Sequence, residues 1–151
     1  MDGLLTMPPN YLPNQESGAT PRRLPQQVAQ ANILDDEERP MNRVREQDLP
    51  YRNGDWGVKY LFRGPKIDWG VVLLKPGQAM GAHGHREVEE SFYVMEGEGK
   101  LLVNDVPNPA RRGDAFTVAP FEKHDILNDG DSEMKVVFIK APYLPEDKIS
   151  Y

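Results

Sequence analysis

The sequence predicts an all-β domain, either a sandwich or a closed barrel, preceded by an irregular N-terminal arm. Three observations carry this prediction. From Trp56 onward short apolar runs recur at regular intervals, glycine, proline, asparagine and aspartate separate them, and no segment after residue 50 has helical spacing of useful length. Regular short strands with such turns are typical of sandwiches and barrels.

Residues 1–50 differ in composition from the rest of the chain. They hold half of the 14 prolines and few large apolar residues, so they cannot bury enough surface to fold alone. The one helical candidate is residues 26–38, where the apolar positions are thinly spaced. We therefore predict an arm over residues 1–50, either disordered or lying across a neighbouring subunit, and a barrel domain over residues 51–151.

Within the barrel domain, strand-like runs alternate with turn signals. Lys75-Pro76-Gly77-Gln78 places proline and glycine at the central positions of a type II turn. Gly97 and Gly99 mark another junction, and Asn104-Asp105 a third. The predicted strands are residues 57–62, 67–74, 90–95, 100–103, 114–118, 124–127 and 134–139.

Composition excludes several classes of function. The chain of 151 residues has a formal net charge of −6 and no basic stripe or zinc-finger pattern, which argues against nucleic acid as a partner. It has no cysteine, so disulfides, thiolate metal sites and cysteine nucleophiles are excluded. Only 38% of the residues are hydrophobic, and this modest core favours a homodimer that hides more apolar surface.

The first residues resemble neither a signal peptide nor a membrane span. Asp2 stands where a signal peptide needs positive charge, and the apolar stretch stops at Pro8. We therefore expect a cytoplasmic protein with no membrane partner.

The three histidines of the chain are candidates for one metal site. His83 and His85 are two residues apart, so on an extended strand both imidazoles point to the same side. Among the nearby carboxylates, Glu90 shares its face with the apolar Phe92 and Val94. A carboxylate that points into an apolar interior is costly unless it is paired or bound to a cation, so Glu90 is the predicted carboxylate ligand.

The spacing of these residues resembles the first signature motif of the cupin superfamily. Gly77, five residues, His83-x-His85, four residues, Glu90, six residues and Gly97 fill every position of that motif. The second motif matches at Gly113, His124 and Asn128, and it departs at Ala119 and Phe121, where proline and glycine are usual. A bulky residue disfavours a positive φ angle, so we expect the turn before His124 to differ from the common form.

The resemblance covers roughly residues 57–141 and implies a small jelly-roll barrel with one divalent metal per chain. Its implied ligands are His83, His85, Glu90 and His124. Imidazole and carboxylate ligands without thiolates leave Mn, Fe, Ni, Zn and Co open. Four protein ligands on a six-coordinate ion leave two adjacent positions, where a substrate with neighbouring oxygens could chelate.

Other residues are candidates for the substrate pocket. Met80 and Phe121 lie within a few residues of a ligand, and we expect them at the pocket rim. Phe92 and Phe138 are more typical of a core and complete the candidate set. Lys123 and Tyr60 are weaker candidates for catalytic groups, the lysine as a proton carrier.

Two classes of function agree with these residues. The first is an enzyme, an isomerase, lyase or dioxygenase, that acts on a small oxygen-rich molecule through the metal. The second is a non-catalytic module that binds a sugar acid or another carboxylate. A metal-free sugar epimerase is a third and weaker reading, because all three histidines fall on positions of the metal motif.

Overall fold

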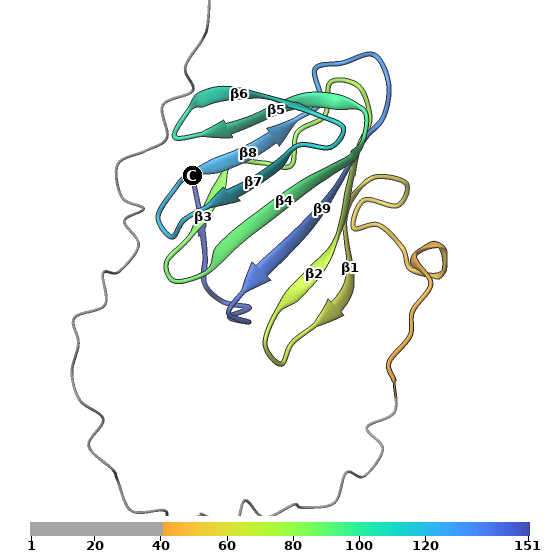
Figure 1. Ribbon diagram of the computed structural model, residues 1–151, viewed down its shortest axis with the longest axis vertical. Helices are drawn as coiled ribbons and strands as arrows, with labels where there is room; N and C mark the ends of the chain where they lie inside the picture. Colours follow the sequence, from red (N-terminus) through yellow and green to blue (C-terminus); the bar gives the residue numbers. More distant parts are fainter. Residues whose placement is uncertain (1–40) are drawn as a thin grey trace, which may run out of the picture. The chain divides into compact units, whose positions relative to one another are not determined.

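Two five-stranded antiparallel sheets face one another in the computed structural model, which describes residues 41–151 (Figure 1). In spatial order, the first sheet consists of β1 (Gly57–Arg63), β2 (Asp68–Leu74), β9 (Met134–Ala141), β4 (Glu89–Glu96) and β7 (Ala115–Val118). The second consists of β10 (Lys148–Ser150), β3 (His83–His85), β8 (His124–Leu127), β5 (Glu98–Val103) and β6 (Val106–Arg111). The predicted all-β fold is confirmed.

The core lies between the sheets because apolar residues alternate along the strands. Phe92 of β4 stands opposite Phe138 of β9 on one side and Phe116 of β7 on the other. Such pairs on one face of a sheet interdigitate with the inner face of the other sheet. The buried core consists of Val72, Leu74, Phe92, Val94, Leu101, Ala110, Val118, Ile126, Met134, Val136 and Phe138.

Three strands were absent from the strands predicted by sequence, and β6 shows why. It carries Pro107 and Pro109, which lower the expectation of a strand. However, among the strands of residues 41–151, β6 is at the edge of its sheet and pairs only with β5. Proline is tolerated at such an edge because its missing N–H faces away from the ladder. The other two, β3 and β10, are only three residues long.

Gly97, the last glycine of the first motif, follows a register irregularity between Val94 and Glu96 of β4. Its φ is +75°, and a Cβ there would overlap the carbonyl oxygen of Glu133 and lie 2.8 Å from Cα of Met134. Only glycine combines this φ angle with so close an approach of two backbones. The motif glycine is therefore a requirement of packing between β4 and the segment that enters β9.

Residues before β1 pack against the first sheet. A short 3₁₀ helix, η1 (Glu46–Asp48), brings the Glu46 carboxylate 2.7 Å from Nζ of Lys135 and 3.7 Å from Nζ of Lys59. The Tyr51 hydroxyl donates to the same carboxylate at 3.2 Å. The helical candidate at residues 26–38 lies outside the described residues. Within residues 41–151, no helix has the length and apolar character needed to cross a membrane.

Candidate metal centre

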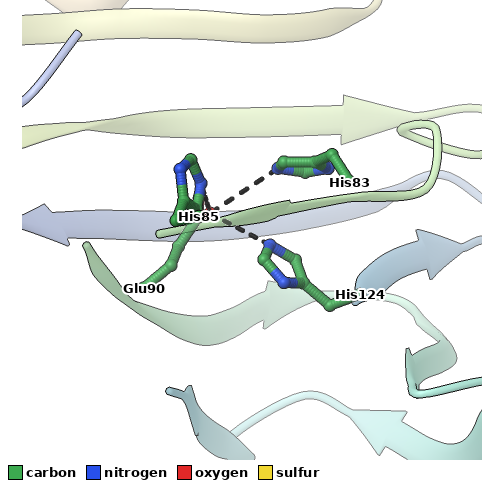
Figure 2. Close-up of side chains that lie close together, drawn as sticks. All are labelled: His83, His85, Glu90 and His124. Carbon is green, nitrogen blue, oxygen red and sulfur yellow. Dashed lines mark hydrogen bonds and ion pairs between the residues drawn. The ribbon is translucent and has the colours of Figure 1, made fainter. Parts of the chain in front are cut away.

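The four predicted ligand residues meet at one point between the sheets. His83 and His85 come from β3 and His124 from β8 of one sheet, whereas Glu90 comes from β4 of the other. The register places His83 directly opposite His124. Figure 2 shows the three imidazoles converging on the Glu90 carboxylate. All four residues are at most 6% exposed.

The Nε2 atoms of all three histidines are directed at one oxygen atom. They lie 3.7 Å (His83), 3.0 Å (His85) and 3.1 Å (His124) from Oε2 of Glu90. One donor atom from each of the four residues lies within 4.8 Å of the others. Donors that each lie about 2.1 Å from a shared ion are separated by up to about 4.2 Å, so small side-chain rotations bring all four onto one cation.

Backbone carbonyl groups set the tautomers of two of these imidazoles. Nδ1 of His83 lies 2.9 Å from the carbonyl oxygen of Gly81, and Nδ1 of His124 lies 2.9 Å from that of Glu122. A carbonyl oxygen only accepts, so each Nδ1 must carry the proton and donate it. A neutral ring then presents its lone pair at Nε2, which is the arrangement of a metal-ligating histidine.

Glu90 is ionised in this surrounding. Burial by itself raises the pKa of the Glu90 carboxyl, but contacts with His124, His83 and His85 hold that pKa well below its usual value. Imidazole lone pairs aimed at a buried carboxylate repel it unless a cation or protons lie between them. The donor set therefore fits a divalent metal ion, which would satisfy the three nitrogens and the carboxylate together.

The turn before His124 keeps the left-handed conformation although glycine is missing. Phe121 has a φ of +66°, so the expectation that a bulky residue would change the backbone here is wrong. The Phe121 N–H donates to the His85 carbonyl oxygen at 2.7 Å, and the ring is 67% exposed. This hydrogen bond joins the turn before His124 to the strand that carries His83 and His85, and it offsets the strain of the positive φ.

Asp147 supports the ligand strand from the C-terminal segment. Its Oδ2 accepts N–H bonds from Arg86, Glu87 and Val88 at 2.9, 3.0 and 3.0 Å. It also lies 3.9 Å from Nδ1 of His85, a buried atom without a hydrogen-bond partner among the described residues. The carboxylate thus fixes the chain just after His85 and places negative charge near its imidazole.

A cavity of about 230 Å³ opens beside the cluster, and three of the four ligand residues lie in its wall. Of the predicted pocket and catalytic residues, Met80, Phe138 and Tyr60 also line it. The complete lining is Arg52, Val58, Tyr60, Arg63, Met80, His83, His85, Glu90, Phe138, Lys140, Leu144, Pro145 and Lys148.

The remaining sequence candidates lie elsewhere. Phe92 is buried in the core, and its ring centre is 5.8 Å from that of His124. Phe121 and Lys123 are absent from the cavity wall. Lys123 instead forms an ion pair with Asp105 at 2.6 Å.

Sequence reasoning missed the cationic residues of the wall, namely Arg52, Arg63, Lys140 and Lys148. A signal existed for Lys140, which lies two residues beyond Phe138 and so on the same face of its strand. Arg52 and Lys148 belong to segments without strand periodicity in the sequence, and only the fold brings them to the cavity.

Comparison with known proteins bears on the same region of the chain. Residues 70–140 match the family model described as "Cupin domain". Protein SchB of Streptomyces halstedii is 32% identical over 82 residues, 54% of this chain and 59% of the relative. Polyketide synthase CurC of Streptomyces cyaneus is 27% identical over 54% of this chain and 53% of the relative. An oxalate-binding protein of Thermotoga maritima is 30% identical over 45% of this chain and 56% of the relative.

The match therefore spans little more than half the length of each of these relatives. Among solved structures, a Klebsiella pneumoniae protein with a double-stranded β-helix domain superposes with a TM-score of 0.63 at 18% identity. That superposition covers 73% of this chain and 96% of the other.

Proposed function

Because this chain contains a cupin domain, as its sequence predicts, we propose that it is a metal-dependent enzyme that acts on a small oxygen-rich substrate. One observation carries the proposal: the cluster of His83, His85, Glu90 and His124 opens directly onto a cavity. A cation in a purely structural site is closed off by its protein ligands, whereas a catalytic one faces an open position. The cavity volume of about 230 Å³ suits a small molecule.

When bound, a divalent ion supplies Lewis acidity that polarises a carbonyl group or stabilises enolate-like charge. The residues of the chain orient the substrate and exclude water. Phe138 and Val58 form an apolar part of the wall. His83, His85 and Glu90 lie at the end of the cavity where the substrate reacts. The Gly81 carbonyl group positions His83, and Asp147 positions the chain just after His85.

Tyr60 is the proposed proton donor. Nζ of Lys140 donates to the Tyr60 hydroxyl oxygen at 3.1 Å, and the guanidinium of Arg63 lies 4.5 Å from the ring centre. Since the oxygen already accepts a bond from a lysine, the hydroxyl hydrogen is directed to another acceptor, and Tyr60 borders the cavity.

The second candidate is a non-catalytic module that binds a carboxylate, and the oxalate-binding relative supports it. The two candidates differ in turnover. An isomerase or lyase works without oxygen and tolerates Mn, Co, Ni or Zn, and a dioxygenase consumes oxygen and requires a redox-active metal. A binding module gains thermal stability with its ligand and converts nothing.

The first test is the metal content of protein purified without chelators or added metal. We expect close to one divalent ion per chain. Iron directs the assays to oxygen uptake on keto acids and enols, and other metals direct them to anaerobic isomerase and lyase screens. An absence of metal, together with no uptake on reconstitution, contradicts the proposal. If the protein is fully loaded with metal and binds a ligand saturably but converts none, the second candidate, the non-catalytic binding module, is the correct one.

A further inference from the structure

The cavity has a cationic wall beside the ligand cluster. Arg52, Arg63, Lys140 and Lys148 all line it, against the single carboxylate of Glu90. The strand register fixes the two lysines next to ligand residues: Lys140 is directly opposite Glu90, and Lys148 is directly opposite His85. Partners in an antiparallel pair project to the same face, so both lysine side chains are directed to the side where the ligands lie.

Three of these four cations, Arg52, Lys140 and Lys148, have no carboxylate partner within residues 41–151. Arg63 pairs with Asp68 at 3.4 Å, but within residues 41–151 no carboxylate lies within 4.0 Å of the charged atoms of Arg52, Lys140 or Lys148. Other lysines of the barrel do have such partners, for example Lys100 with Asp129 at 2.5 Å. The chain as a whole has a net charge of −6, whereas the cavity wall gathers four positively charged side chains.

This concentration is unfavourable while the cavity holds only water. Lys148 and Lys140 lie opposite ligand residues in the two sheets, and Arg52 lines the same wall. Like charges that converge on a partly enclosed cavity repel each other, and an anion that binds among them relieves the repulsion. Lysine and arginine in such an arrangement are the usual partners of phosphate and carboxylate groups.

We propose that Lys140, Lys148 and Arg52 form a subsite for an anionic group, a phosphate or a second carboxylate, of the substrate. The identification of that ligand as a substrate rests on the proposed function, and the anion site itself does not. The substrate class is then a small hydroxy or keto compound that carries an oxyanion group at one end and metal-chelating oxygens at the other. The subsite and the ligand cluster share one cavity of about 230 Å³, so one small molecule can reach both.

The test measures anion binding in protein from which the metal and then the chelator have been removed. The chelator must be removed because a polycarboxylate would itself bind to the cationic side chains of the subsite. Inorganic phosphate and malonate are the two probes, titrated by calorimetry at constant ionic strength. Saturable binding at one site is expected. A preference for phosphate assigns a phosphorylated substrate, and a preference for malonate assigns a dicarboxylate.

Single substitutions connect the binding to the wall. Loss of one charged hydrogen-bond donor costs about 1.5 kcal/mol, so Lys140→Met and Lys148→Met should each weaken binding about tenfold. Lys100→Met, which removes an exposed charge outside the cavity, should leave it unchanged. Circular dichroism confirms that each variant is folded. Undetectable binding, or equal affinities in all variants, overturns the proposal.

A cluster variant separates this inference from the proposed function. His124→Ala removes a metal ligand that does not line the cavity, so it should lose metal and keep its affinity for phosphate or malonate. If the parent protein takes up no metal but binds the anion through Lys140 and Lys148, the proposed function fails and the subsite stands. If metal binds and the anion does not, the subsite proposal fails and the proposed function stands.

Discussion

Oδ2 of Asp147 lies 3.9 Å from Nδ1 of His85, although 62 positions separate the two residues along the chain. The distance is too long for a hydrogen bond. The carboxylate instead accepts three N–H groups from the residues that follow His85. Asp147 therefore positions the ligand strand through its backbone, and this arrangement gives a first prediction.

Asp147→Ala should destabilise the fold by about 2–3 kcal/mol, because it leaves buried N–H donors without their charged acceptor. Asp147→Asn keeps one acceptor oxygen and should cost less. Chemical denaturation measures both. Asp114→Asn is the matched control, since Asp114 is exposed and accepts one N–H, from Arg111. Equal losses in Asp147→Asn and the control would contradict the role given to Asp147.

The same carboxylate predicts a dependence of stability on pH. Burial raises the pKa of Asp147, but the N–H bonds from Glu87, Val88 and Arg86 outweigh it and lower the pKa below the usual value. A lowered pKa contributes stability that is complete above the unfolded value, about 3.9, and is lost as the pH falls through the folded value. Below pH 4 the parent should therefore lose stability more steeply than Asp147→Asn.

Ligand substitutions should weaken metal retention. Glu90→Gln removes the charge that opposes three imidazoles, and His124→Ala removes one donor; losses of more than tenfold in affinity are expected for each. The measurement is metal per chain after dialysis against a graded chelator. Glu89→Gln is the control, because Glu89 is exposed and adjacent on the same strand. If Glu90→Gln and His124→Ala hold metal as well as the parent, the ligand assignment is wrong.

Replacing a motif glycine can cost stability through backbone strain and through steric overlap, and Gly97 and Gly77 allow the two costs to be measured separately. Both have positive φ, +75° and +80°, but a Cβ would overlap the Glu133 carbonyl oxygen at Gly97 and meet nothing within 4 Å at Gly77. Gly77→Ala should cost about 1–2 kcal/mol from backbone strain alone. Gly97→Ala should cost at least about 2 kcal/mol more, since two backbone segments must separate. Similar unfolding midpoints for the two variants would refute the packing argument.

Phe121→Gly should stabilise the protein. The side chain is 67% exposed, so its removal loses little burial, and glycine relieves the strain at φ +66°. The gain in the folded state is partly offset by the greater freedom of glycine in the unfolded chain, which leaves a net gain of about 0.5–1 kcal/mol. Phe121→Ala is the control, because alanine keeps a Cβ and hence the strain. A thermal midpoint for Phe121→Gly at or below that of Phe121→Ala would contradict this prediction.

The parts of the fold and site that the sequence predicted are those with local periodicity. His83 and His85 are two apart on a strand, so alternation alone placed both imidazoles on one side of that strand. Glu90 shares a face with apolar residues, so alternation also placed it on the inward face of its own strand. The long strands β1, β2, β4 and β9 likewise follow from apolar runs between turn residues. These features depend on neighbours in the chain, which one sequence displays.

The parts that escaped prediction depend on contacts between distant segments. Lys148 and Asp147 reach the site only because the short strand β10 adds to the edge of β3. Pro107 and Pro109 obscured an edge strand that tolerates them. The Phe121 N–H, at a residue with positive φ, donates a hydrogen bond to the carbonyl oxygen of His85 in β3, and no propensity of phenylalanine predicts this conformation.

The origin of the ligands in two different sheets has a mechanical consequence. β4 contributes Glu90 to one layer, while β3 and β8 contribute the histidines to the other. A cation held by all four is a cross-link between the layers, comparable to a disulfide, in a chain that has no cysteine. Loading and stripping the ion should therefore change hydrogen exchange in both layers together, because the ion joins the two sheets of the barrel.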